Sequence, residues 1–265
     1  MSKISCNFVV NICNKDFKVK SLKNYVTMKS ITEKMYEGLK PLYKNLMEHC
    51  GAFCDDYTKT TGVNIVSFAA QWGQFYPQEE KEGILFVGRA TRGWSNDDRN
   101  VDNLFDHPKD RIFNREDQMV WAKDYQSPFW RVLRGVANHF YGENGVENVA
   151  WTNVSKLAPD SDNGNPAGKL YDIQQEDDYA IFSKEVEILS PKVIVFFTGE
   201  GWGDDYLCTI NNYEEPQVLS EYEWASYKTK VYQVDDRLVI MSEHPQTRPE
   251  QEHIDCLVNI ISKYM

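Results

Sequence analysis

Two short, uninterrupted apolar runs constrain the fold of this chain more than any other feature. One covers residues 84–87 (Ile-Leu-Phe-Val) and ends at Gly88, and the other lies within residues 192–198 and ends at Gly199. A strand with one solvated face alternates apolar and polar residues, whereas a strand buried on both faces is apolar throughout. Both runs are therefore predicted to be central strands of a mainly parallel sheet with helices on each face.

The rest of the chain alternates between strand-like and helix-like segments. Residues 149–153 and 237–242 complete the predicted sheet, and 227–234 form a hairpin with the latter that turns at Asp235–Asp236. Helices are expected over 30–51, 52–60, 129–140, 177–189 and 249–263, the first with a capping box formed by Ser30 and Glu33. This order predicts an α/β fold, a three-layer α/β/α sandwich around a central, mainly parallel, four-stranded sheet.

The length of 265 residues and the 42% hydrophobic content favour one large domain over two. We assign this domain to residues 30–265, with an irregular insertion at about 200–225 between the third strand and the hairpin. Residues 1–29 have a Lys-rich patch and no clear period, and are interpreted as a loosely packed N-terminal extension. A natural start at Met28 is the alternative.

Charge and cysteine content exclude several classes of protein. The formal charge of −11 argues against nucleic-acid binding through a broad basic surface, although it leaves room for a local cationic cleft. The six cysteines include no Cys-x-x-Cys pair, so we expect no cofactor, metal or cluster. No apolar run approaches the ~20 residues of a membrane span, and no secretory signal is recognisable. We therefore expect a cytoplasmic, monomeric protein that does not enter a membrane.

Residues 151–159 (Trp-Thr-Asn-Val-Ser-Lys-Leu-Ala-Pro) are predicted to contain the end of a strand, with Asn153 at the point where a loop begins. An Asn carboxamide offers one acceptor and two donors, which suits reading the edge of a nucleobase. The alternative is an Asn that satisfies the backbone of a turn. Ligands of parallel α/β sheets bind beyond the carboxyl ends of the strands, and Gly88-Arg89, Gly199 and His244 are expected there as well.

Several segments, in the right order between residues 83 and 263, resemble the uracil-DNA glycosylase superfamily. The segment 88–93 (Gly-Arg-Ala-Thr-Arg-Gly) stands where that family has its Gly-x-x-Pro-Gly loop, and Ser127-Pro128-Phe129 resembles the family's Pro-Phe pair. Residues 152–159 are similar to the Asn-bearing strand end of the thermophile-type uracil glycosylases, and 190–195 to the next strand. Residues 243–248 (Glu-His-Pro-Gln-Thr-Arg) stand where His-Pro-Ser closes the fold, closest to the single-strand-selective type.

The resemblance implies excision of a base by cleavage of its N-glycosidic bond. Such an enzyme extrudes the base, stacks it, reads its edge and stabilises the anion that leaves. Phe129 would stack on the base, Asn153 would pair with it, and His244 would donate a hydrogen bond to the developing oxyanion. The remaining candidates are Gly88 and Ala90 against the base, Asp97 and Asp98 for the attacking water, and Arg89, Arg92, Gln246 and Arg248 for DNA or phosphate.

The chain also departs from the family pattern. The first loop has Arg89, Ala90 and Thr91 where the family has a water-orienting residue and a Pro, and Gln246 replaces the Ser after His-Pro. The cysteines that hold the iron–sulfur cluster of the thermophile-type relatives have no counterparts. Phe129 could equally be plain core, and Arg248 a solvated residue before the last helix.

Two hypotheses follow. The first is a divergent hydrolase that excises uracil or another deaminated or modified base from DNA, single- or double-stranded. The second is a catalytically silenced module that binds a nucleobase, a nucleotide or single-stranded nucleic acid without cleaving it. An unrelated α/β hydrolase is a third option, but the chain has neither a Gly-x-Ser-x-Gly elbow nor a Gly-x-x-x-x-Gly-Lys phosphate loop.

Overall fold

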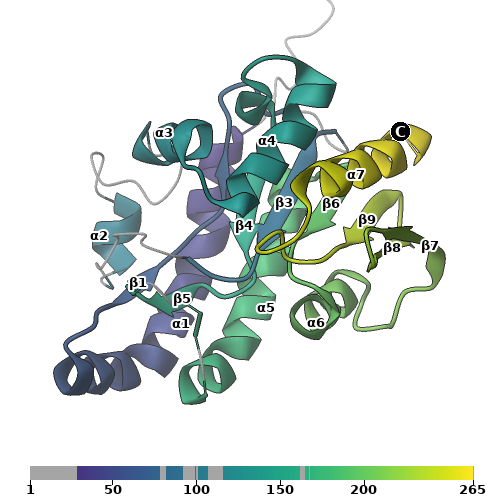
Figure 1. The fold of residues 1–265 in the computed structure, drawn as a ribbon. Helices are drawn as coiled ribbons and strands as arrows, with labels where there is room; N and C mark the ends of the chain where they lie inside the picture. The colour runs from purple at the N-terminus through teal and green to yellow at the C-terminus, as the bar shows by residue number, and fades with distance from the viewer. Residues whose placement is uncertain are drawn as a thin grey trace, which may run out of the picture.

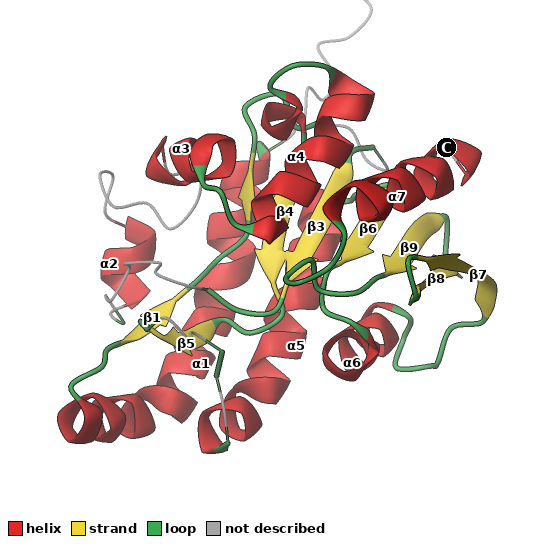
Figure 2. Cartoon of the chain, viewed as in Figure 1, coloured by secondary structure: helices red, strands yellow, loops and turns green. Residues whose placement is uncertain are grey.

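The computed structural model describes residues 29–77, 82–91, 99, 101–106, 116–161, 165–166 and 168–264 (Figures 1 and 2). In chain order the elements are α1 (Ile31–Thr61), β1 (Ile65–Ser67), β2 (Gln71–Trp72), β3 (Ile84–Gly88), α2 (Val101–Asp106), α3 (Glu116–Asp124), α4 (Pro128–Tyr141), the 3-10 helix η1 (Gly145–Asn148), β4 (Ala150–Asn153), β5 (Leu157–Pro159), α5 (Lys169–Leu189), β6 (Val193–Phe196), α6 (Glu200–Ile210), β7 (Val218–Trp224), β8 (Tyr227–Val234), β9 (Arg237–Met241) and α7 (Glu250–Tyr264).

The main sheet has the order β2-β4-β3-β6-β9-β8-β7. Its four middle strands, β4, β3, β6 and β9, are the four predicted strands, and they run parallel to one another. In particular, β3 pairs directly with β6, from Ile84 opposite Val193 to Val87 opposite Phe196, which confirms that the two apolar runs share a sheet. The prediction of four strands was wrong, because β2, β8 and β7 extend this sheet with antiparallel pairings.

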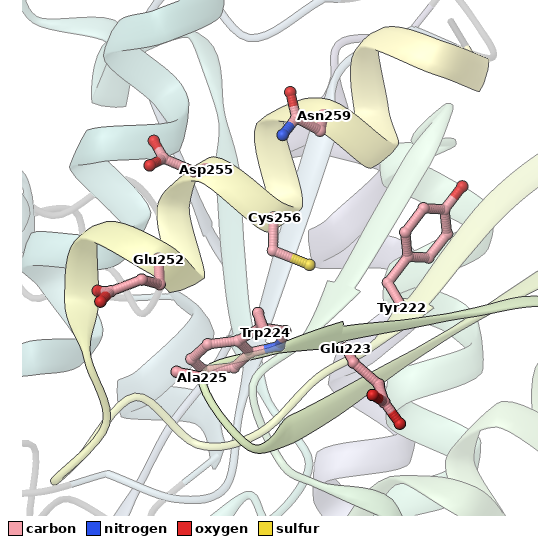
Figure 3. Close-up of a pocket in the computed structure, with 8 residues that line it drawn as sticks. All are labelled: Tyr222, Glu223, Trp224, Ala225, Glu252, Asp255, Cys256 and Asn259. Atoms are coloured by element: carbon pink, nitrogen blue, oxygen red, sulfur yellow. The ribbon is translucent and has the colours of Figure 1, made fainter.

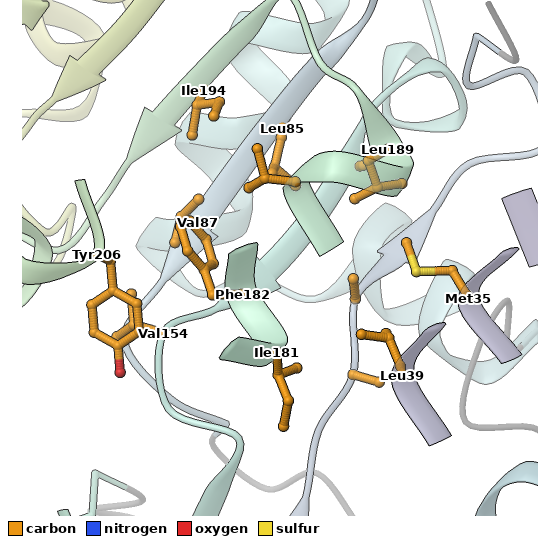
Figure 4. Packing of buried hydrophobic residues seen from close by; sticks show 14 of the residues in the cluster. Met35, Leu39, Leu85, Val87, Val154, Ile181, Phe182, Leu189, Ile194 and Tyr206 are labelled. Atoms are coloured by element: carbon orange, nitrogen blue, oxygen red, sulfur yellow. The ribbon is translucent and has the colours of Figure 1, made fainter. Parts of the chain in front are cut away.

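Helices cover both faces of the sheet (Figure 1), which explains the apolar runs. Along β3, Leu85 and Val87 pack into the cluster that contains the buried faces of α1, α5 and α6, whereas Ile84 and Phe86 pack into the cluster that contains α4 and α7. Figure 4 shows the first of these clusters, with side chains of α1 and α5 meeting those of β3. A strand with a helix layer on each side has no polar face, as the sequence predicted.

The first helix differs from its prediction in length but not in its start. The side chain of Ser30 accepts a hydrogen bond from the Glu33 N–H, and the Glu33 carboxylate accepts one from the Ser30 N–H at 2.8 Å, so the capping box is confirmed. The predicted break near Gly51 is wrong, because α1 continues to Thr61. Buried Cys50 and Cys54 extend the apolar stripe of this helix by another turn, and the stripe packs against α5.

Other boundaries were also wrong. The segment 200–225, expected to be irregular, contains the helix α6 and the strand β7. Helix α5 begins at Lys169, two turns before the expected start. The start was missed because the buried residues of the first two turns, Leu170 and Gln174, do not form an apolar stripe. Helices α2 and α3, which lie between β3 and α4, were not predicted from the sequence. Of the predicted N-terminal extension, 1–29, residues 1–28 lie outside the described residues.

Among the helices that the structure describes, none combines the length and the apolar character needed to cross a membrane.

Candidate functional site

The carboxyl ends of the four parallel strands meet at one edge of the sheet. Gly88 at the end of β3 is the register partner of Asn153 at the end of β4. Next along the edge, the Arg89 side chain donates two hydrogen bonds to the carbonyl of Thr198, at 3.0 and 2.7 Å, and so ties the loop after β3 to the loop after β6. The Gly199 N–H in turn donates to the carbonyl of Ser242 beyond β9, at 2.9 Å.

Gly88, Asn153 and Phe129 come into contact at this edge, although they are far apart in sequence. A Cβ atom built on Gly88 would lie 2.4 Å from Oδ1 of Asn153 and 3.2 Å from Cε2 of Phe129. Phe129 stands in the first turn of α4, where Ser127 caps the helix and Pro128 occupies the first position. The missing side chain of Gly88 therefore lets an aromatic ring and a carboxamide approach the same point of the backbone.

Phe129 is only half-buried. One edge-to-face contact, with a centroid distance of 5.5 Å, sets its ring against Phe197, and a second one at 5.2 Å sets it against Trp130. Both contacts fix the orientation of the ring, while part of its surface stays open. The description as plain core therefore does not account for this residue fully.

The carboxamide of Asn153 has no hydrogen-bond partner among the residues that the structure describes. The neighbouring backbone is bonded without it: the Val154 N–H donates to the Gly88 carbonyl and the Ser155 N–H to the Arg89 carbonyl, both at 2.9 Å. The alternative in which Asn153 satisfies turn backbone is therefore not what the structure contains. A half-buried carboxamide with its donors and acceptor unused is suited to binding a ligand.

His244 lies in the loop after β9 and is neutral. Burial, together with the positive charges of Arg89 and Arg248, lowers the pKa of His244 to about 4. Its Nδ1 atom accepts a hydrogen bond from the Gln246 N–H at 3.2 Å. In the neutral ring the proton must then be on Nε2, which makes that atom a hydrogen-bond donor at any pH well above 4.

The two described arginines of the site are already engaged. Arg89 lies over the ring of Trp202, 5.5 Å from its centroid, besides bonding Thr198, and its burial lowers the pKa of the guanidinium. Arg248 bonds the Glu243 carboxylate at 3.1 Å and lies 4.4 Å from the centroid of Tyr227. These contacts hold both cations at the strand ends and leave each guanidinium only part of its donors for a ligand.

The other predicted site residues are less informative. Ala90 is half-buried directly after β3, and Gln246 is exposed and reaches His244 through its backbone. Arg92, Asp97 and Asp98 lie outside the described residues. Glu243, which precedes His244, is a carboxylate that the sequence analysis did not assign to the site.

A buried network behind the site was also not predicted. His253 of α7 is fully buried, stacks on Trp224 at a centroid distance of 4.2 Å and shares a 2.8 Å hydrogen bond with Ser242. Burial lowers the pKa of His253 to about 3. The apolar pattern of α7 predicts a core face of Ile254, Leu257, Val258 and Ile261. The structure buries Leu257 and Ile261 of these, leaves Ile254 and Val258 half-buried, and buries His253 and Ile260 instead.

A separate hollow of about 310 Å³ lies between the β7–β8 hairpin and α7 (Figure 3). Its lining residues are Tyr222, Glu223, Trp224, Ala225, Glu252, Asp255, Cys256 and Asn259. None of them is a predicted site residue, and burial raises the pKa of Cys256 to about 11, so its thiol is protonated and unreactive at neutral pH. Within the described part of the chain, no group of three or more His, Cys, Asp or Glu side chains is arranged to hold a metal ion.

No protein-family model matches this chain, and no curated protein matches it in sequence.

Proposed function

We propose that the chain is a divergent member of the uracil-DNA glycosylase superfamily that excises uracil or another deaminated base from DNA. The observation that carries the proposal is the contact of Phe129, Gly88 and Asn153, because a stacking ring and an unpaired carboxamide meet there over backbone without a side chain. The four parallel strands and the helices on both faces are compatible with the three-layer fold of that family.

The proposed chemistry needs three actions. The flipped base stacks on the open part of Phe129, and its amide edge pairs with the carboxamide of Asn153. As the bond between the base and C1′ breaks, its electron pair moves onto the base, and the neutral His244 donates the Nε2 proton in a hydrogen bond to the resulting oxyanion. Water then adds to C1′ and loses a proton to solvent, while the base anion takes up a proton from solvent, which leaves an abasic sugar and the free base.

A silenced binding module is the second candidate, and one observation favours it. A base that activates water must be a free carboxylate or a similar group, but Glu243 is bound to Arg248 at 3.1 Å. Residues 88–91 contain no acid. A protein that lost the water-activating residue would still stack and read a base through Phe129 and Asn153.

The two candidates are separated by an excision assay. The protein is incubated with single- and double-stranded oligonucleotides that carry uracil, hypoxanthine or xanthine, and abasic sites are revealed by alkaline cleavage. Excision by the wild type supports the enzyme, whereas binding of the same oligonucleotides without cleavage supports the silenced module. If the protein neither cleaves nor binds any of these oligonucleotides, both candidates are refuted.

Two variants test the roles of the site residues. Asn153→Asp replaces the amide donor with an acceptor, so we expect a change in which base is accepted. His244→Ala removes the donor to the leaving base, and we expect the excision rate to fall on the order of 100-fold or more. Matched controls are Asn259→Asp and His139→Ala, which change exposed residues away from the strand ends and should leave the rate unchanged.

A further inference from the structure

A buried ion pair lies directly beneath Asn153. Lys156, in the connection from β4 to β5, and Glu185 of α5 both have side chains that are 0% exposed, and their Nζ and Oε2 atoms are 2.7 Å apart. The ammonium of Lys156 also donates to Oγ1 of Thr152 at 2.9 Å and to the backbone carbonyl of Asn153 at 2.6 Å. All three N–H donors of the lysine are thus used, and two of them act on the end of β4.

Both oxygens of the Glu185 carboxylate also accept hydrogen bonds. Its Oε2 atom also accepts from Oγ1 of Thr152 at 2.7 Å, and its Oε1 atom accepts from the Ala70 N–H at 3.0 Å. Asp178, seven residues or about two turns earlier on α5, accepts from the backbone N–H of Lys156 at 3.1 Å. Helix α5 therefore bonds Thr152 of β4 directly through Glu185, and it is linked to the carbonyl of Asn153 only through Lys156.

Such a pair is poorly explained by stability alone. Transferring two charges out of water is costly, and a buried ion pair can often be replaced by apolar side chains of similar volume without loss of stability. What apolar side chains cannot supply is a directed hydrogen bond to the Asn153 carbonyl. Rotation of the peptide between Asn153 and Val154 would also move the carboxamide of Asn153. The bond from Lys156 to the Asn153 carbonyl restricts this rotation on one side of the peptide, and the bond from the Val154 N–H to the Gly88 carbonyl restricts it on the other side.

We propose that Lys156 and Glu185 are positioning residues that hold the carboxamide of Asn153 in the orientation that selects the base. This proposal rests on the proposed function, because it concerns how the protein selects a base. In it, selectivity depends on the Lys156–Glu185 ion pair, although neither side chain contacts the base. Because Oδ1 of Asn153 and Cε2 of Phe129 lie beside the same point of Gly88, a small rotation of the peptide would change the position of the carboxamide relative to the ring.

The decisive variant replaces both charges at once. In Lys156→Met or Glu185→Leu alone, one buried charge stays unpaired, so the temperature of unfolding should fall steeply. The double variant has no unpaired charge from this pair, so its unfolding temperature should lie above those of both single variants, but below that of the wild type because the Ala70 N–H and the Asn153 carbonyl lose a partner. If the pair positions Asn153, the double variant should still lose at least tenfold in kcat/KM for excision and should discriminate less between uracil and hypoxanthine.

A matched control uses the same helix. Gln174 of α5 is also fully buried and bonds the backbone N–H and carbonyl of Leu157, at 2.9 and 3.1 Å, without touching Asn153. Gln174→Leu should therefore affect stability but not the selectivity between bases. Thr152→Val removes only the hydroxyl that bonds both Lys156 and Glu185. It should cause a smaller loss of kcat/KM and of selectivity than the double variant, and it serves as the test if the double variant does not fold.

One readout does not depend on activity. The side-chain NH2 signals of Asn153 can be assigned in a ¹⁵N-labelled sample by their absence in Asn153→Ala. They should move toward the shifts of a free carboxamide in the double variant and in Thr152→Val, but not in Gln174→Leu. Unchanged Asn153 signals and unchanged selectivity in a folded double variant would overturn the positioning role. Shifted signals in a protein that neither binds nor cleaves any base would uphold it and refute the proposed function instead.

Discussion

Replacing Gly88 with Ala is the most direct perturbation of the proposed site. The new Cβ would lie 2.4 Å from Oδ1 of Asn153, whereas ordinary contacts begin at about 3.4 Å, so the carboxamide must move by about 1 Å. It would also press on the ring edge of Phe129 at 3.2 Å. A misplacement of about 1 Å at a reacting centre can cost on the order of 100-fold in rate, and we expect a loss of that size in kcat/KM.

The same substitution should affect stability much less. Overpacking a dense region costs about 1–3 kcal/mol, and the loss of backbone freedom in the unfolded chain returns about 0.4–1 kcal/mol of this. A net decrease of about 1–2 kcal/mol in the free energy of unfolding is expected, which leaves the protein folded at 25 °C. Urea denaturation measures this decrease, and the excision assay, or oligonucleotide affinity if the protein only binds, measures the functional loss.

Gly51→Ala is the matched control for Gly88→Ala. Gly51 lies within α1, and a Cβ there would have no neighbouring atom within 4 Å. Since Ala is favoured over Gly in a helix by up to about 1 kcal/mol, this variant should be slightly more stable and fully functional. A Gly88→Ala protein with wild-type activity and affinity would show that Asn153 and Phe129 do not form the site.

Two further predictions concern stability. The pKa values of His244 and His253, about 4 and about 3 in the folded protein, lie below the ordinary value of 6.5, so their stabilising effect is complete above pH 6.5 and is lost as the pH falls from 6.5 toward 4. Each histidine should contribute a slope of up to about 1.4 kcal/mol per pH unit in that window, and urea denaturation at pH 7, 5.5 and 4.5 should show a shallower slope for His253→Asn than for the wild type. Ser30→Ala should lower the free energy of unfolding by about 0.5–2 kcal/mol, because it removes the capping box of α1, and an unchanged urea midpoint would contradict this.

The sequence predicted those parts of the fold that depend on local patterns. Strands β3 and β6 are apolar throughout because both faces are covered, and the capping box depends only on Ser30 and Glu33. The edge strand β7 was missed, because its residues Val218 and Leu219 are exposed apolar side chains without the alternation of a half-buried strand. The start of α5 was missed because buried Gln174 contributes hydrogen bonds, not apolar surface.

Only those residues of the candidate site that lie at or just beyond strand ends could be predicted from the sequence. Asn153, Gly88 and His244 follow from where apolar runs stop, since the carboxyl ends of parallel strands share an edge. Nothing in the sequence indicated that Lys156 is fully buried, as lysine is normally exposed, and its partner Glu185 is 29 positions away. Nor could the pattern of α7 predict His253, because its burial depends on the stack with Trp224.

The packing of α1 against α5 also bears on the order in which the chain can acquire structure during synthesis. The apolar stripe of α1 packs in part against α5, which is made more than a hundred residues later, a delay on the order of ten seconds at the usual pace of a ribosome. The part of the stripe that α5 covers in the folded protein therefore stays exposed in the nascent chain during that interval. His244 and the Trp224–His253 stack emerge later still, so the strand-end site is not complete before nearly the whole chain has left the ribosome.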